Sequence, residues 1–283
     1  MSQRIVIIGA GGLVGTVLAA QARREGRSVL ALTSAQCDVT DAGAPERYLA
    51  ADDAVINCAA YTKVDDAERD EARAFAVNAA GAENVAHACA RVGAGLVHVS
   101  TDYVFSGDFG DGERRPYEID DETGPLSVYG RSKLAGEFGV LAAMPDAHVV
   151  RTSWIFSGGH GGDFVATMRR LADGDGTVDV VADQIGTPTY VDDLVDALLQ
   201  VADGTIVESV LHAANQGETS RFEQARAVFE LVGADPARVR PVDSGRHPRP
   251  APRPQYSALS AVRSTEAGLT PLRPWRDALA SAI

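Results

Sequence analysis

The chain has 283 residues, of which 45% are hydrophobic and 23% are charged, a composition typical of a folded globular protein. The 39 acidic residues outnumber the 26 basic ones, and the formal net charge of −13 disfavours binding to nucleic acids or to anionic membrane surfaces. The three cysteines form no CxxC pair, so we expect neither a disulfide framework nor a zinc site.

The chain begins with an uncharged run, residues 5–22, that four glycines interrupt. Its front, residues 4–8, predicts a strand, and residues 13–25 predict a helix. A secretory signal needs an uninterrupted apolar core and a cleavage site, and neither is found here. We therefore expect no signal peptide and no membrane span, and a cytoplasmic location.

The turn between this strand and this helix is rich in glycine. Gly9 permits a tight turn, Gly12 lets the backbone approach a pyrophosphate, and Gly15 lets the helix pack closely on the strand. The spacing is GxxGxxG, and the free N–H groups of the helix N-terminus favour phosphates. The turn predicts a dinucleotide site, although a tight turn without a ligand has the same pattern.

Short apolar runs continue to alternate with helical patterns along the chain. Further strands are expected at residues 28–32, 54–57, 95–100, 148–151 and 210–213, and further helices at 70–92, 128–142 and 191–201. The strands are continuously apolar, as in a parallel sheet that is covered on both faces. The pattern predicts an α/β fold, a Rossmann-type doubly wound parallel sheet with right-handed crossovers.

After about residue 150 the alternation becomes less regular. Helices are expected at 164–171 and 222–232, and the proline-rich residues 246–254 are expected to form an extended surface linker. We therefore expect a dinucleotide-binding domain and a smaller, irregular C-terminal substrate-binding lobe. The domain would comprise residues 1–150, with roughly 176–215 returning to it, and the lobe would comprise 151–175 and 216–283.

The end of the second strand bears on the choice of cofactor. Leu32 is followed by Thr33 and Ser34, without the carboxylate that holds the ribose 2′-hydroxyl in many NAD-selective sites. Hydroxyl groups tolerate a 2′-phosphate that a carboxylate would repel, so the sequence favours NADPH, with NADH as the alternative. Asp38 comes later and either contacts the adenine or serves as a helix cap or turn residue.

Tyr129 and Lys133 are four residues apart and therefore lie on the same face of the expected helix. Reduction of a carbonyl needs a proton donor at the oxygen, and a nearby ammonium lowers the pKa of a tyrosine by stabilising the phenolate. The chain has only two lysines, Lys63 and Lys133, so a YxxxK pair is rarely produced by chance. An incidental pair on a solvated helix is the alternative.

Thr101 follows the strand at residues 95–100. In an open α/β sheet, ligands bind beyond the carboxyl ends of the strands, where a hydroxyl can donate to the substrate oxygen or to the phenol. Alone, Thr101 would more simply cap the end of the strand. Together with the glycine turn and the Tyr–Lys pair, it indicates a catalytic group of Thr101, Tyr129 and Lys133.

These residues, with several longer stretches, resemble the extended short-chain dehydrogenase/reductase family, and within it the members that reduce nucleotide-linked keto sugars. The stretches are NCAAYT (57–62), STDYVF (100–105), YGRSKLAGE (129–137), RTSW (151–154) and GTPTY (186–190), and the likeness continues to Trp275. The resemblance implies that NADPH reduces the 4-keto group of dTDP-4-dehydro-β-L-rhamnose to dTDP-β-L-rhamnose. Tyr129 would be the proton donor, Lys133 would bind the nicotinamide ribose, and Thr101 would assist.

The same resemblance implies the remaining contacts. Gly12, Leu13 and Val14 would touch the pyrophosphate, Asp38 and Val39 the adenine, and Ala60, Tyr61 and Thr62 the nicotinamide half. Thr101, Asp102 and Trp154 match sugar-binding positions, with the Trp154 ring laid on the sugar, although a buried core tryptophan is an alternative. Arg253 matches a position near the nucleotide, but Gln255, Tyr256 and Ser257 depart from the usual pattern that follows it. The family also makes Mg²⁺ and a homodimer possible, although the sequence identifies no metal ligands.

Two other functions remain open. One is another nucleotide-sugar enzyme, either a different 4-ketoreductase or an epimerase/dehydratase, because these share the glycine turn and the YxxxK pair. The other is a non-catalytic, NADP-binding regulatory subunit on the same fold. The complete set of Thr101, Tyr129 and Lys133 favours catalysis over this second alternative.

Overall fold

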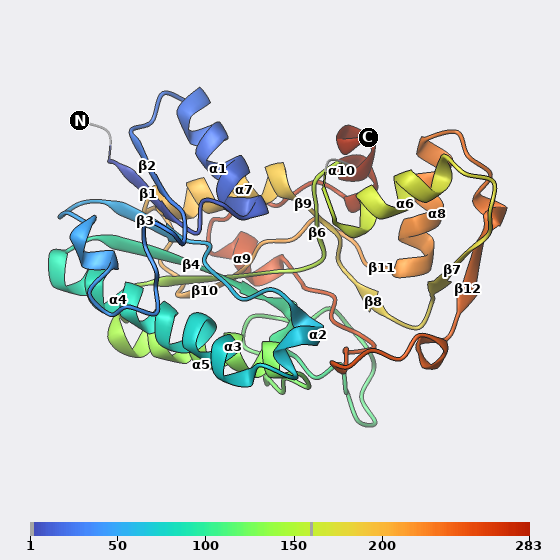
Figure 1. Cartoon of the computed structure of the whole chain (residues 1–283), viewed down its shortest axis with the longest axis horizontal. Helices are drawn as coiled ribbons and strands as arrows, with labels where there is room; N and C mark the ends of the chain where they lie inside the picture. The colour runs from blue at the N-terminus through green and yellow to red at the C-terminus, as the bar shows by residue number, and fades with distance from the viewer. Residues whose placement is uncertain (1–2, 159–160) are drawn as a thin grey trace.

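A computed structural model describes residues 3–158 and 161–283, and its centre is a six-stranded sheet in which every strand pair is parallel (Figure 1). The strands are β1 (Ile5–Ile8), β2 (Val29–Leu32), β3 (Ala54–Asn57), β4 (Gly95–Thr101), β5 (His148–Thr152) and β10 (Val210–His212). Their order is β10-β5-β4-β3-β1-β2. The predicted doubly wound α/β fold is confirmed. The order reverses at β1, so the switch point that favours ligand binding lies beside the glycine turn.

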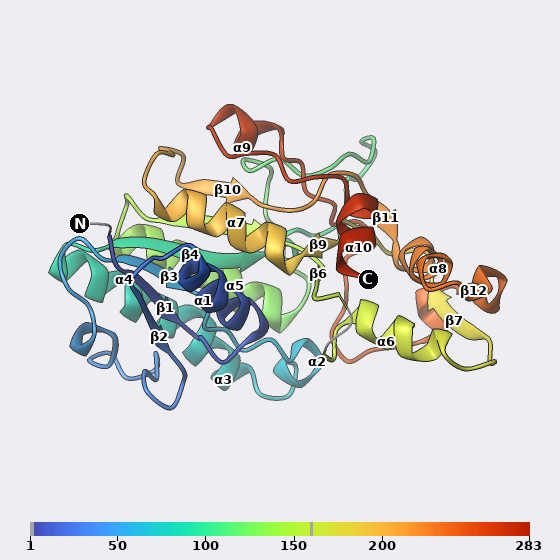
Figure 2. The same cartoon turned by 90° about the horizontal axis from the view of Figure 1, so that it is seen from above.

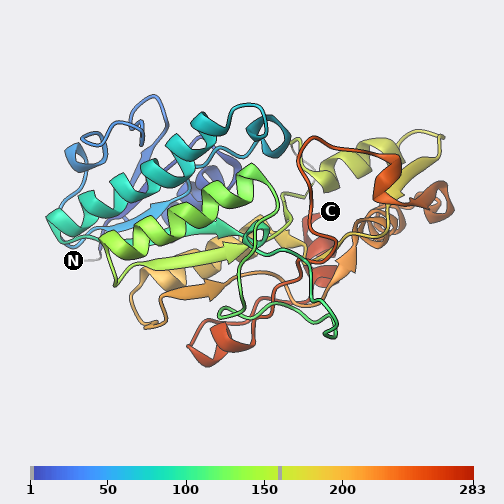
Figure 3. The ribbon, with the colours of Figure 1, turned by 90° about the horizontal axis from the view of Figure 1, so that it is seen from below.

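Helices cover both faces of this sheet. Helices α1 (Leu13–Arg24) and α7 (Val191–Ala202) lie on one face, and α3 (Glu71–Phe75), α4 (Gly81–Val92) and α5 (Val128–Ala143) lie on the other (Figures 1 and 3). Side chains of β1 alternate between the two resulting cores: Ile5 and Ile7 pack towards α1 and α7, and Val6 and Ile8 towards α4 and α5. The predicted helix 70–92 is a continuous helical stretch, with a π-helical turn at Ala76–Ala80 between α3 and α4.

A smaller lobe lies beyond the carboxyl ends of the strands (Figures 1 and 2). Its core, which includes Val165, Phe229 and Trp275, is enclosed by α6 (Phe164–Ala172), α8 (Arg221–Leu231), α10 (Trp275–Ala282) and the parallel pair β7 (Val178–Val181) and β12 (Val239–Val242). Short elements join it to the sheet: α2 (Val64–Ala67), α9 (Val262–Glu266), β6 (Ile155–Phe156) paired with β9 (Thr189–Tyr190), and β8 (Ile185–Gly186) paired with β11 (Thr219–Ser220). No helix among the described residues has the length and apolar character to cross a membrane.

The proline-rich residues 246–254 are more than the surface linker that the sequence predicts. Their backbone is irregular after a short 3₁₀ turn at Ser244–Arg246, as expected for prolines. However, Ala251 is buried, and Arg253 forms an ion pair of 2.9 Å with Asp65 on α2. Residues 246–250 lie exposed at the surface, as the prediction of an extended surface linker has it, while the ion pair with Asp65 holds the end of the segment against the sheet domain.

A buried ion pair fixes helix α5 to the sheet. Arg151 on β5 donates from Nη2 to Glu137 Oε2 at 2.8 Å, and its Nη1 donates to the carbonyl of Ile119 at 3.2 Å. Ser100 on β4 donates its hydroxyl to Glu137 Oε1 at 2.5 Å. The side chains of Arg151 and Glu137 are only 6% and 3% exposed, so each charge depends on the other for neutralisation.

Replacing Arg151 by Met should therefore lower the free energy of unfolding by about 3 kcal/mol or more, since it strands a buried carboxylate. Arg263→Met is the matched control, because Arg263 pairs with Asp120 at a surface where both side chains are exposed, 44% and 64%. The control should lose less than about 1 kcal/mol. Urea titrations of both variants measure the difference, and equal losses would contradict the importance of the buried pair.

Candidate active site

The glycine turn has the close packing that its sequence predicts. Gly9 has a φ of +84°, and a Cβ at this position would lie 2.5 Å from the backbone nitrogen of Ala59. A Cβ on Gly15 would lie 2.5 Å from the Gly9 carbonyl oxygen. Side chains at these two positions would separate β1 from α1 and from the chain that follows β3.

A groove of about 580 Å³ lies beside this turn, at the carboxyl ends of β1, β2 and β3. It is lined by Gly9, Gly11, Gly12, Thr33, Ser34, Ala35, Cys37, Asp38, Val39, Cys58, Ala59, Ala60, Tyr61, Arg73 and Val77. The groove therefore brings together six of the predicted cofactor residues, from the glycine turn and from two further loops. Gly15, Leu13 and Val14 lie just behind its wall, in the first turn of α1.

Asp38 has the turn role that was considered as an alternative, and it also lines the groove. Its carboxylate accepts hydrogen bonds from the backbone and the hydroxyl of Thr40, at 3.0 and 2.8 Å. These bonds hold the pKa of Asp38 below its ordinary value, with a smaller effect from the charge of Arg73. Arg73 is a cation on the groove wall that the sequence analysis missed.

A second hollow, of about 370 Å³, lies between the carboxyl ends of β4 and β5 and the smaller lobe. It is lined by Thr62, Val64, Ser100, Thr101, Asp102, Tyr103, Tyr129, Thr152, Ser153, Trp154, Ile155, Asp163, Phe164 and Arg221. Thr101, Tyr129, Asp102 and Trp154, predicted from separate stretches of sequence, therefore share one site. Thr62 belongs to this hollow rather than to the groove.

Tyr129 is held as a neutral phenol. Burial raises its pKa above the ordinary value, and a hydrogen bond with the Thr101 hydroxyl opposes this only in part. Lys133 is not among the groups that shift the pKa of Tyr129, and other groups bond the lysine, so the expected lowering by Lys133 stays a prediction. Its Nζ donates to the carbonyl of Val99 at 2.6 Å and lies 3.3 Å from His98 Nε2. Burial lowers the pKa of Lys133 to about 8.

Two charged groups line the hollow: Asp102, which is buried, and Arg221, which is half-buried. Asp102 accepts hydrogen bonds from Ser257 at 2.6 Å and Thr101 at 3.1 Å, and burial raises its pKa to about 6. Burial lowers the pKa of Arg221 to about 10. Within residues 3–158 and 161–283, Arg221 makes no ion pair, and its guanidinium is instead 3.6 Å from the centre of the Trp154 ring. No sequence motif pointed to this cation.

Trp154 has an unusual backbone, with a φ of +45° in the left-handed region. Gly186 packs directly against its ring, where a Cβ would collide with the indole, and Arg221 covers a ring face. A sugar stacked on that face would have to displace Arg221. The stacking of Trp154 on the sugar therefore stays a prediction.

Arg253 does not line either cavity. Its guanidinium makes hydrogen bonds of 2.9 and 3.1 Å to the two carboxylate oxygens of Asp65. It also acts on Tyr103, whose pKa is raised by burial and lowered in part by this arginine. The structure therefore places Arg253 behind the wall of the hollow, one side chain away from it.

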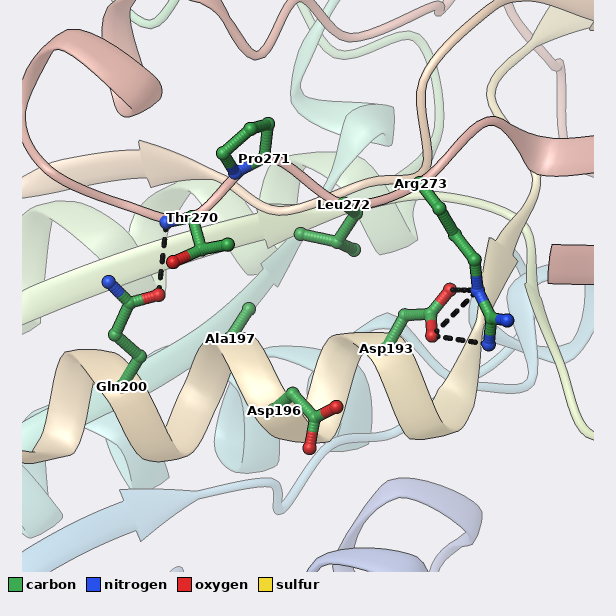
Figure 4. A pocket seen from close by; sticks show the side chains of 8 residues that line it. All are labelled: Asp193, Asp196, Ala197, Gln200, Thr270, Pro271, Leu272 and Arg273. Atoms are coloured by element: carbon green, nitrogen blue, oxygen red, sulfur yellow. Dashed lines mark hydrogen bonds and ion pairs between the residues drawn. The ribbon is translucent and has the colours of Figure 1, made fainter. Parts of the chain in front are cut away.

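Another hollow, of about 360 Å³, lies between α7 and the segment that precedes α10 (Figure 4). Its polar groups are bonded across it: Arg273 pairs with Asp193 at 2.7 Å, and the Thr270 backbone donates to Gln200 at 3.0 Å. These bonds hold the C-terminal segment against α7. None of the predicted site residues lines this hollow.

The described residues offer no site that fits the Mg²⁺ implied by the resemblance. No group of three or more His, Cys, Asp or Glu side chains within 3–158 and 161–283 is arranged to hold a metal ion. Asp102, a carboxylate that lines the hollow, already accepts hydrogen bonds from Thr101 and Ser257.

A glycine turn at the switch point of a parallel sheet, beside Thr101, Tyr129 and Lys133, is the arrangement of a Rossmann-type oxidoreductase. The RmlD substrate binding domain family matches residues 3–283, and the chain belongs to this family.

Individual relatives agree with this assignment over the whole chain. The chain is 65% identical to the dTDP-4-dehydrorhamnose reductase of Mycolicibacterium smegmatis, over 100% of this chain and 86% of the relative. A crystal structure of a dTDP-4-dehydrorhamnose reductase from Clostridium acetobutylicum superposes with a TM-score of 0.91 at 35% identity, covering 99% of this chain and 98% of that one. The Bacillus anthracis enzyme in complex with NADP gives 0.90 at 34% identity, with the same coverage.

The packing of the glycine turn leads to a prediction. Gly15→Ala should force the turn away from Gly9, lower the free energy of unfolding by about 1–3 kcal/mol, and weaken dinucleotide binding. Gly95→Ala is the control, because a Cβ there would make only an ordinary contact of 3.8 Å with the Asp53 carbonyl. Fluorescence titration with the dinucleotide measures the affinity, and an unchanged affinity in Gly15→Ala would contradict the placement of the site.

Proposed function

We propose that the chain uses NADPH to reduce the 4-keto group of dTDP-4-dehydro-β-L-rhamnose, giving dTDP-β-L-rhamnose. The observation that carries this proposal is the convergence of Thr101, Tyr129 and Asp102 in one hollow beside the groove. The full-length identity of 65% to a reductase of this substrate supports the choice of sugar. The activity belongs to the oxidoreductases.

The groove has the residues to hold NADPH, which supplies the hydride when bound. Gly9, Gly12 and Gly15, with Leu13 and Val14, would place backbone N–H groups at the pyrophosphate. Asp38 and Val39 would meet the adenine, and Ala60, Tyr61 and Thr62 the nicotinamide half, which therefore points towards Tyr129 and Lys133. Thr33, Ser34 and Arg73 give the groove a wall that suits a 2′-phosphate.

Tyr129 is the proton donor in this proposal. Its burial keeps the hydroxyl protonated until the substrate oxygen develops negative charge and takes the proton. Thr101 holds the phenol by a hydrogen bond, and its single hydroxyl proton, which goes to Asp102 in this structure, would turn to the substrate oxygen once the substrate is bound. Lys133 would bind the nicotinamide ribose and, as an ammonium, stabilise the phenolate that remains.

Substrate binding would involve both sides of the hollow. Thr101, Asp102 and Trp154 would contact the sugar, and the unpaired guanidinium of Arg221 suits the diphosphate, which arginine binds well. Arg253 would contribute near the nucleotide on exchanging part of its bonding to Asp65. The sheet domain would be residues 1–150 with 176–215, and the substrate lobe 151–175 with 216–283. A homodimer and a cytoplasmic location stay predictions from the sequence.

The direct test is the loss of NADPH absorbance when the protein meets dTDP-4-dehydrorhamnose, formed in situ from dTDP-4-dehydro-6-deoxyglucose by a 3,5-epimerase. We expect oxidation that depends on the epimerase and yields dTDP-rhamnose. Oxidation without the epimerase would instead identify a different 4-ketoreductase. Binding of NADPH without any turnover would favour the regulatory subunit.

Tyr129→Phe should lower kcat by about 100-fold or more, because it removes the proton donor, while the affinity for NADPH changes little. Tyr190→Phe is the matched control, since its hydroxyl bonds to Asp192 away from the hollow and the groove. Steady-state kinetics and cofactor titration measure the two effects. Near-normal turnover in Tyr129→Phe would refute its role.

The groove wall predicts that NADPH binds more tightly than NADH. Thr33→Asp should weaken NADPH binding by about tenfold relative to NADH, because the new carboxylate repels a 2′-phosphate. Titration of both cofactors against the parent and the variant measures the preference. Equal affinities in the parent, or an unchanged ratio in the variant, would place the 2′-phosphate elsewhere.

A further inference from the structure

Beneath the hollow, three buried polar side chains form a row from β3 through β4 to α5. Asn57 and His98 are register partners on neighbouring strands, and Lys133 extends to them from the helix. The three residues are 1%, 0% and 2% exposed. Buried polar groups have to satisfy one another, so the direction of each hydrogen bond can be derived from one fixed end.

The backbone of Ala59 fixes that end. Its N–H lies 3.1 Å from Asn57 Oδ1, and because a backbone N–H only donates, the amide oxygen must face it. Asn57 Nδ2 therefore faces His98 Nδ1, at 3.2 Å. An amide nitrogen also only donates, so Nδ1 accepts and the imidazole proton resides on Nε2. Burial lowers the pKa of His98 well below its ordinary value, which keeps the ring neutral.

The Nε2–H group then points at Lys133 Nζ, 3.3 Å away. A neutral amine can accept from this N–H while it donates to the Val99 carbonyl at 2.6 Å. An ammonium has no lone pair that could accept from Nε2–H, so two donor groups would face each other. We propose that Asn57 and His98 are positioning residues that set the protonation equilibrium of Lys133 by presenting a fixed N–H group to its amine.

The surroundings of Lys133 shift its pKa in both directions. Burial lowers its pKa, and the negative charge of Glu137 opposes this, as a Cys58 thiolate would. Glu137 is bonded to Arg151 on β5, and burial raises the pKa of Cys58 to about 12, so this cysteine is a thiol. Lys133 therefore changes its charge close to neutral pH. Under the proposed function, on which this consequence rests, the charged form is the one that stabilises the Tyr129 phenolate.

The test uses the composition of the chain, because two lysines give two side-chain NMR signals. Lys63, whose side chain is 75% exposed, provides the reference in protein labelled with ¹³C-lysine. We expect the Lys133 signal to titrate near pH 8. In protein labelled with ¹⁵N-histidine, the His98 ring should show the Nε2–H tautomer, assigned by the loss of its signals in His98→Phe. An Nδ1–H tautomer in the parent protein would overturn the proposal.

The substitution Asn57→Asp reverses the direction of the hydrogen bonds between His98 and its two neighbours, with little change in the shape of the side chain at position 57. The carboxylate still accepts from Ala59, but its second oxygen accepts from His98 Nδ1–H, so Nε2 becomes an acceptor for an ammonium. We expect the ¹⁵N spectrum to show this tautomer change, and the Lys133 midpoint and the alkaline limb of kcat to rise together by about 1 pH unit or more.

The double variant Asn57→Asp/His98→Phe controls for the added charge, since its carboxylate cannot act through the ring. The Lys133 midpoint should rise clearly less from His98→Phe to the double variant than it rises from the parent to Asn57→Asp. An equal rise would overturn the role of His98. If Asn57→Asp does not fold, the parent spectra still decide the tautomer. The NMR measurements need no turnover, so a midpoint that moves in a protein without reductase activity would refute the proposed function and leave this inference standing.

Discussion

The contact between helix α5 and strands β4 and β5 determines where the chemistry can occur. The inner face of the helix buries Lys133 and Glu137, each bonded to a group on those strands: the Val99 carbonyl for the lysine, and Arg151 for the glutamate. A buried polar network of this kind can be satisfied in one register only, because any sliding of the helix would leave charges without partners. Tyr129, one turn before Lys133, is therefore held at the edge of the sheet.

Tyr129 lies near the point where the two cavities approach each other. The groove follows the carboxyl ends of β1 to β3, and the hollow follows those of β4 and β5, so a ligand that fills both crosses the edge near Tyr129. In the proposed function, the sheet domain provides the proton donor Tyr129 and the cofactor groove. The lobe provides Arg221, a half-buried cation whose charge no acidic side chain in the described part of the chain neutralises by an ion pair. Catalysis and recognition of the anionic part of a substrate thus come from different parts of the chain.

Local sequence patterns were sufficient to predict the strands of the central sheet, the main helices and the glycine turn, because these depend on neighbours within a few residues. They also placed Thr101 and Tyr129 correctly at one site, since the carboxyl ends of parallel strands meet at one edge. Local patterns could not predict the bonds between side chains that are far apart in the sequence. Arg253 bonds to Asp65, which is 188 positions away, and His98 meets Lys133 across 35 positions. The bonds of Lys133 to Val99 and His98 were missed for this reason, and Arg73 and Arg221 had no local signal at all.

The central claim is that a keto sugar is reduced with its carbonyl oxygen at Tyr129 and its diphosphate towards the lobe. A crystal structure with NADP⁺ and dTDP-rhamnose tests this most directly. The account predicts the sugar O4 within hydrogen-bonding distance of the Tyr129 hydroxyl, about 2.6–3.2 Å, with the nicotinamide beside Ala60 and Tyr61 and the diphosphate at Arg221. A sugar bound away from Tyr129, or a dinucleotide outside the groove, would contradict it.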